Sequence, residues 1–89
     1  KGTIETAYTI MNGEYEVIEA EIIETSELIN KELKNSNLPD EIRIGAVLRD
    51  NKVIIPRSNF VFQKEDKVVF LAKKDSISVV ENIFRISSI

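Results

Sequence analysis

The segment from Leu38 to Ala72 reads LPDEIRIGAVLRDNKVIIPRSNFVFQKEDKVVFLA and decides the fold. It contains three runs of β-type composition that are separated by turn residues. Asp50-Asn51 lies between the first two runs, and both residues tolerate the positive φ angles of a two-residue type I′ turn, so a hairpin is predicted. The last run, VVFLA at 68–72, is continuously apolar, which is typical of a strand covered on both faces.

The register of this hairpin predicts which side chains share a face. With the turn at Asp50-Asn51, Val47 lies opposite Ile54. One face is expected to be core, and its members are Ile42, Ile44, Ala46, Leu48, Val53 and Ile55. The other face is expected to be exposed, with Gly45, Val47 and Ile54 at its centre and Arg43, Arg49 and Lys52 at its rim.

A second hairpin is predicted near the N-terminus, where Asn12-Gly13 suits another two-residue turn. This turn places Ile10 opposite Tyr15. Near the tip one face carries Tyr8, Ile10, Tyr15 and Val17, whereas further along the apolar residues Ile18, Ala20 and Ile22 lie on the other face. A hairpin of this kind must meet two neighbours, its own core and a second domain or subunit.

Two short helices complete the expected elements. We expect Ser26 to cap the first, with Leu28, Ile29 and Leu33 on its apolar side. We expect Asp75 to cap the second, whose apolar stripe comprises Ile77, Val80, Ile83 and Phe84. The predicted fold class is α+β, a small mixed or antiparallel sheet with two short helices on one side, preceded by a β-hairpin.

Composition argues against catalysis and metal binding. The chain has 89 residues and contains neither histidine nor cysteine, which removes the usual general base, metal ligand and thiol nucleophile. Its three glycines cannot form a dinucleotide-binding loop or a Walker loop. The acidic run with Glu19 and Glu21 is interpreted as solvated carboxylates rather than a calcium site. We therefore expect no enzyme, no metal and no bound cofactor in this chain.

The formal net charge of −3 argues against general binding of nucleic acid, because neutralising phosphates needs a basic face. Residues 1–41 carry ten acidic and three basic side chains, a net of −7, whereas residues 42–89 carry five and nine, a net of +4. The chain is therefore acidic toward its N-terminus and basic toward its C-terminus. No apolar run approaches the roughly 20 residues that span a bilayer.

The strongest functional candidate in the sequence is the face with Gly45, Val47 and Ile54 at its centre and Arg43, Arg49 and Lys52 at its rim. Arginine presents a planar fork to phosphate, glycine lets a ligand approach the backbone, and an apolar floor suits a nucleobase. The same pattern also describes an interface between two copies of the chain. A dimer interface, a small anionic ligand at that interface and a plain solvated strand remain three alternatives.

Four segments in this order resemble a known family: YEVIEAEI at 15–22, LPDEIRIGAVLRDNKVIIPRSNFVF at 38–62, QKEDKVVFLA at 63–72 and VENIF at 80–84. They are similar to the RCK C-terminal, or TrkA C-terminal, regulatory domain of Trk-type potassium uptake regulators. On this resemblance, residues 14–89 form that domain, and residues 1–13 are a connecting strand and hairpin turn from an upstream domain. The chain departs from the family at Glu65, where glycine is usual, and at Asn59-Phe60.

The resemblance implies a regulatory domain that forms a homodimer and controls potassium uptake through a partner membrane transporter subunit. It implies an upstream domain that binds NAD or ATP, and a cytoplasmic location at the inner face of the membrane. Some family members bind a ligand, cyclic di-AMP among them, between the two copies. The matching ligand-side positions are Ile44, Arg49, Ile55 and Pro56. The alternative is a pure subunit-interaction module without its own ligand.

Overall fold

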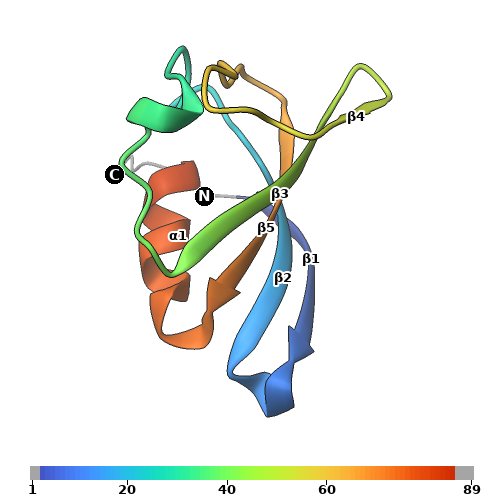
Figure 1. Ribbon diagram of the computed structural model, residues 1–89, viewed down its shortest axis with the longest axis vertical. Coiled ribbons are helices and arrows are strands. Elements are labelled where there is room, and N and C mark those ends of the chain that lie inside the picture. The colour runs from blue at the N-terminus through green and yellow to red at the C-terminus, as the bar shows by residue number, and fades with distance from the viewer. Residues whose placement is uncertain (1–2, 86–89) are drawn as a thin grey trace.

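The computed structural model describes residues 3–85, with side chains described for residues 8–84. Residues 1–2 of the predicted connecting strand and residues 86–89 of the predicted regulatory domain lie outside the described range. The elements are β1 (Thr3–Ile10), β2 (Tyr15–Glu21), β3 (Ile42–Arg49), β4 (Lys52–Ile54), β5 (Lys67–Lys73) and α1 (Ile77–Arg85). The strands form one sheet in the order β1-β2-β5-β3-β4, with every pairing antiparallel (Figure 1). The prediction of a small α+β fold is confirmed.

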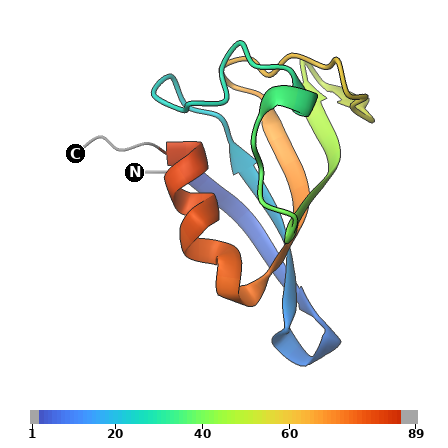
Figure 2. The ribbon, with the colours of Figure 1, turned by 60° about the vertical axis from the view of Figure 1, so that its left-hand side comes forward.

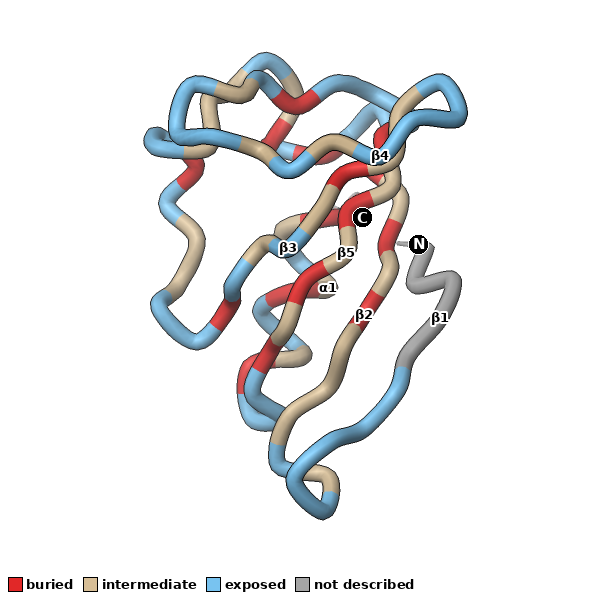
Figure 3. The backbone as a smooth tube through the Cα atoms, turned by 45° about the vertical axis from the view of Figure 1, so that its right-hand side comes forward, coloured by how far each residue is buried: buried red, intermediate tan, exposed pale blue. Residues whose placement is uncertain are grey.

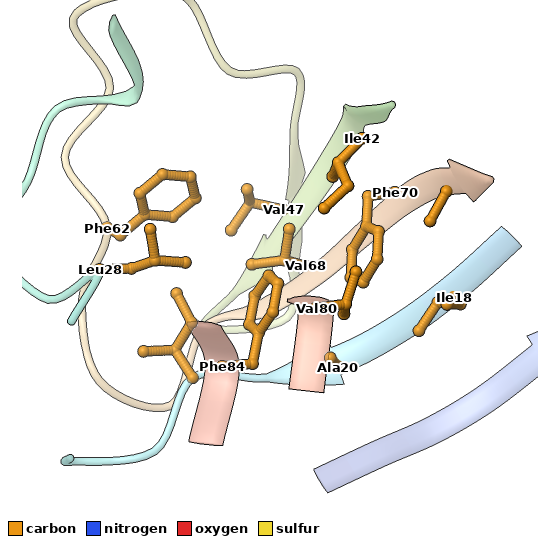
Figure 4. Packing of buried hydrophobic residues seen from close by; sticks show 12 residues of the cluster. Ile18, Ala20, Leu28, Ile42, Val47, Phe62, Val68, Phe70, Val80 and Phe84 are labelled. Carbon is orange, nitrogen blue, oxygen red and sulfur yellow. The ribbon is translucent and has the colours of Figure 1, made fainter. Parts of the chain in front are cut away.

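The core lies between one face of the sheet and the segments that cover it, among them α1 (Figures 2 and 4). Strand residues of this face alternate with residues of the opposite face, as the two-residue period requires. The rings of Phe70 on β5 and Phe84 on α1 stack with their centroids 5.1 Å apart. The fully buried apolar residues are Ile18, Ala20, Ile22, Leu28, Ile42, Val47, Phe62, Val68, Phe70, Ala72, Val80 and Phe84. Ile77 and Ile83 pack against this cluster, so the predicted stripe of the last helix is confirmed.

Both predicted hairpins form, but only the second has a two-residue turn. Asp50 and Asn51 have φ angles of 52° and 65° and connect Arg49 directly to Lys52. In the first hairpin, Ile10 pairs with Tyr15 as predicted. Its turn is longer than predicted, because the chain is left-handed from Met11 through Gly13 and the Glu14 N–H donates to the Met11 carbonyl at 3.1 Å.

The predicted helix after Ser26 is wrong. The Ser26 hydroxyl accepts from the Leu28 N–H at 3.1 Å, as a cap would, but it also donates to the Ile83 carbonyl at 3.0 Å. Asn30 then has φ 68°, which a right-handed helix cannot include. Residues 24–32 therefore form turns that insert Leu28 into the core, and only a 3-10 turn, Leu33–Asn35, follows. At the other end a 3-10 turn that contains Asp75, Lys74–Ser76, leads into α1.

A β-bulge at Gly45 reverses the predicted faces of the second hairpin after that residue, whereas Ile42 and Ile44 lie on the core face as predicted. Opposite β5, the register shifts between Ile44 and Ala46, so Gly45 is an extra residue and the alternation of side chains changes there. Val47, expected to be exposed, is fully buried on the same face as Ile42, and Ile54 packs against the core. Val53 and Ile55, expected in the core, are 69% and 72% exposed. The predicted outward face centred on Val47 and Ile54 is wrong.

Candidate functional site

The edge of β3 before the bulge is open on its outer side. β4 pairs with β3 only from Val47 to Arg49, so within residues 3–85 no further strand pairs along the outer side of β3 at 42–46. Residues 33–38 pass beside this edge and leave a hollow of about 230 Å³. The hollow is lined by Leu33, Lys34, Ser36, Asn37, Leu38, Ile42, Arg43 and Ile44.

The lining of this edge hollow combines an apolar floor with cationic groups. Arg43 and Lys34 are exposed, whereas the flanking Ile44 is half-buried against the core. The Ser36 hydroxyl donates to the Leu33 carbonyl at 2.7 Å, and this bond holds the turn beside the hollow. Cations beside an apolar surface suit an anion that also carries a flat apolar group.

Arg49 serves a structural purpose that the sequence did not reveal. Its Nε and Nη2 atoms donate to the two carboxylate oxygens of Asp66, each at 2.7 Å. Nη2 also donates to the Val61 carbonyl at 2.9 Å, and the guanidinium lies 4.7 Å from the centre of the Phe60 ring. Asp66 is 1% exposed and accepts a further bond from the Gln63 N–H at 2.9 Å. This network joins the end of β3 to the 60–66 loop.

The hydrogen bond to Asp66 raises the pKa of Arg49 above its usual range, although partial burial opposes this. The charges of Asp66 and Asp50 add to the increase. The guanidinium therefore stays protonated, and the donors that contact Asp66 and Val61 are not free for a phosphate. The predicted ligand contact of Arg49 stays a prediction, now with fewer available donors.

The structure brings together only part of the predicted site. Ile44 and Arg43 line the edge hollow, and Gly45 is exposed beside them. Ile55 is exposed and Pro56 half-buried just after β4, and their ligand contacts remain predictions. Sequence reasoning missed Lys34, Ser36 and Asn37, because a helix was expected to end there. The turn-forming Asn35-Ser36-Asn37 run was the available signal.

A metal site finds no support in this region. Among residues 8–84, whose side chains are described, no group of acidic side chains is arranged to hold a metal ion. Across the same residues every buried side-chain nitrogen or oxygen has a hydrogen-bond partner. No helix in that range is long and apolar enough to span a membrane.

An antiparallel sheet with a C-terminal helix on one face defines a small domain of the α+β class. Residues 17–85 match the family model described as the TrkA-C domain, and the chain belongs to this family. The predicted family resemblance is thereby confirmed.

Relatives by sequence carry the same family name. The chain is 39% identical over 87 residues to the Trk system potassium uptake protein TrkA of Azorhizobium caulinodans, covering 98% of this chain and 19% of that protein. It is 38% identical over 64 residues to the Trk system potassium uptake protein TrkA homolog of Archaeoglobus fulgidus, covering 72% of this chain and 15% of that protein. The chain therefore spans less than a fifth of either relative.

Solved structures share the fold at low sequence identity. The crystal structure of the GsuK RCK domain superposes with a TM-score of 0.78 at 13% identity, over 98% of this chain and 19% of that chain. A structure described as an RCK domain with cda superposes with a TM-score of 0.65 at 17% identity, over 78% of this chain and 97% of that chain. The α+β fold of an RCK domain is therefore shown.

Proposed function

We propose that this domain is a ligand-binding regulatory and dimerisation domain of a potassium uptake subunit, and that it controls a partner membrane transporter. The observation that carries the proposal is the edge hollow, in which Arg43 and Lys34 flank the apolar side chains of Ile42 and Ile44. Family membership and the names of the sequence relatives support the role in potassium transport. The ligand is a small anion with a flat apolar group, of which cyclic di-AMP is one example.

The proposal for the wider assembly is supported by the same family membership. The relatives are about five times longer than this chain, which leaves room in such a protein for an upstream domain that binds NAD or ATP. Residues 1–13 would connect to that domain, and residues 14–89 would form the regulatory unit. In this proposal the protein works in the cytoplasm, at the inner face of the membrane, beside the transporter it controls.

The mechanism requires that the ligand distinguish two arrangements of the assembly. A ligand can shift an equilibrium only by the difference between its binding free energies for the two states. The edge hollow lies between the β3 edge and the 33–38 turn, so a ligand bound there would fix their separation. A coupling of about 1–3 kcal/mol would change the balance of states by roughly 5- to 150-fold.

A second candidate is a pure interaction module that holds subunits in register while another domain senses the ligand. The observation that favours it is the arrangement of Arg49, whose donors are already used by Asp66 and Val61. These bonds leave Arg49 fewer donors for a phosphate, whereas the cations beside the hollow, Lys34 and Arg43, are exposed.

Thermal unfolding of the chain separates the two candidates. The melting temperature is measured alone and with cyclic di-AMP, ATP, NADH, potassium chloride and calcium chloride. A bound ligand at 100 times its dissociation constant stabilises the folded state by about 2.7 kcal/mol. We expect cyclic di-AMP or a nucleotide to raise the melting temperature, and Arg43→Ala to reduce that increase, whereas the control Arg57→Ala preserves it. If no compound changes the melting temperature, the interaction module is the correct function.

A further inference from the structure

The sheet has a second face that this chain leaves uncovered. α1 lies on the core face, against which Phe60 and Phe62 also pack, and it is the one α-helix within residues 3–85, so no α-helix of that range lies on the other face (Figure 2). The apolar side chains of this open face are Tyr8, Ile10, Tyr15, Val17, Ala46, Leu48, Val53, Val69 and Leu71. None of them belongs to the hydrophobic core or to the residues packed against it.

The apolar side chains of the open face are exposed to solvent, which is unfavourable for side chains of this kind. Tyr8 and Val53 are 66% and 69% exposed, and the residues between them on β2 and β5 are only half-buried (Figure 3). A shallow apolar hollow of about 80 Å³ lies beside Tyr8, Val17 and Val69. β5 has the continuously apolar sequence of a strand covered on both faces, yet within the described residues 3–85 only one face is covered. A contiguous patch of this kind marks an interaction surface.

Charges of opposite sign lie at diagonal corners of the open face. Lys73 and Arg43 flank Leu71, since Arg43 is directly opposite Leu71 and Lys73 is two residues along β5. Glu19 and Glu21 lie on β2 toward the other end, opposite Val69 and Lys67. Lys67 therefore lies beside the acidic corner. The apolar band separates the basic corner on β3 and β5 from the acidic corner on β2.

We propose that the open face binds a second copy of this chain, face to face about a two-fold axis. The axis lies between the two faces and is parallel to them. It runs along the diagonal that does not join the two charged corners, so rotation about it places the basic corner of each copy over the acidic corner of its partner. It also places the apolar bands in contact, with the two sheets crossed at nearly a right angle, one of the two common ways in which sheets pack. A two-fold contact needs a surface that is complementary to itself, and opposite charges at diagonal corners supply this.

This inference adds to the proposed function the surface through which the copies pair. It rests on the proposed function for the existence of a dimer. It replaces the predicted interface at Val47 and Ile54, whose side chains belong to the core. Arg43 belongs both to the open face and to the edge hollow, so a ligand in the hollow would lie at the rim of the contact.

Sedimentation velocity over a concentration series tests the proposal. We expect a wild-type dimer, and Leu71→Glu weakens it at least ~100-fold because an unpaired carboxylate would be buried at the centre of the contact. Val79→Glu, on the exposed side of α1 and remote from the face, leaves the dissociation constant within about twofold. Circular dichroism checks that each variant is folded. Tyr8→Glu is a second disruptive variant at an exposed position, and it is expected to weaken the dimer if Leu71→Glu does not fold.

Charge reversal tests the diagonal arrangement. Arg43→Glu and Glu19→Lys each weaken the dimer by about 10-fold, since like charges then face one another. Both changes in one chain restore the dissociation constant to within about threefold of wild type. A wild-type monomer at all concentrations, a Tyr8→Glu dimer as strong as wild type, or a double variant no better than either single variant would overturn the proposal. Pairing is measured here by sedimentation without ligand, whereas ligand binding is measured by the melting shift of the wild-type chain, so failure of pairing and failure of ligand binding are distinguishable.

Discussion

At the scale of single residues, the role that the sequence suggests for Arg49 differs from the contacts that Arg49 makes in the structure. In the sequence it is a cation beside a hairpin turn, and a phosphate contact is a reasonable expectation. In the structure its planar fork matches the Asp66 carboxylate 17 residues along the chain. No local pattern identifies that partner, because the contact exists only after the 60–66 loop has folded against the end of β3.

We predict that Arg49→Lys lowers the free energy of unfolding by about 1.5–3 kcal/mol, because lysine cannot reproduce the two-point bond to Asp66. Arg57→Lys is the matched control, since Arg57 is exposed, and it is expected to change the free energy by less than about 0.5 kcal/mol. Urea denaturation measures both. An Arg49→Lys chain as stable as wild type would remove the structural role of the fork.

The raised pKa of Arg49 also determines the pH range of this contribution. A group whose pKa is higher in the folded state stabilises fully below its unfolded value and loses its effect as pH rises through the folded value. The folded and unfolded pKa values of Arg49 both lie above the range from about pH 6 to pH 9. Deprotonation of its guanidinium therefore does not reduce the difference in free energy of unfolding between wild type and Arg49→Lys within that range.

At the scale of elements, the strands and hairpin registers followed from the sequence, because turn residues and apolar alternation are local signals. Ile10 pairs with Tyr15 and Val47 pairs with Ile54 as the turns predicted. The faces of β3 did not follow, because a one-residue bulge changes the alternation and Gly45 was interpreted only as a point of ligand approach. The helix after Ser26 was wrong for a related reason, since burial of Leu28 in the core outweighs local helix propensity.

The two glycines at these elements should respond differently to alanine. Gly13 has φ 91°, so Gly13→Ala is expected to lower the free energy of unfolding by about 1–2 kcal/mol. Gly45 is outside the left-handed region, and an added Cβ would lie 3.7 Å from the Val69 carbonyl oxygen, an ordinary contact. Gly45→Ala is therefore expected to be neutral or stabilising by up to about 1 kcal/mol.

Urea denaturation of both variants tests whether the bulge requires glycine at position 45. A loss at Gly45 as large as that at Gly13 would show that the backbone at the bulge is more constrained than its φ angle indicates.

At the scale of the whole molecule, the two faces of one sheet have different partners. α1 and the covering loops meet the core face, and the open face is left with Val17, Val69 and Leu71 half-buried. The sequence indicated this arrangement only in outline, through the N-terminal hairpin that needed two neighbours and the strand VVFLA that suited cover on both faces. Which side chains of β3 lie on the core face after Gly45 depends on the bulge, and this could not be predicted from alternation.

The candidate site was predictable to a similar extent. Ile44 and Arg43 were selected from the sequence and line the edge hollow, because they lie on β3 before the bulge. Lys34 and Asn37 were not selected, because they reach the hollow through turns rather than through a predicted helix.

Control by a ligand, as proposed for this domain, requires coupling between ligand binding at the edge hollow and pairing through the open face. Sedimentation velocity that measures the dimer dissociation constant with and without each of the five test compounds examines this most directly. We predict that a compound which raises the melting temperature also changes the dissociation constant by at least ~5-fold, as a coupling of about 1 kcal/mol requires. If such a compound binds and the dissociation constant stays the same, ligand binding and pairing are independent and the account is contradicted.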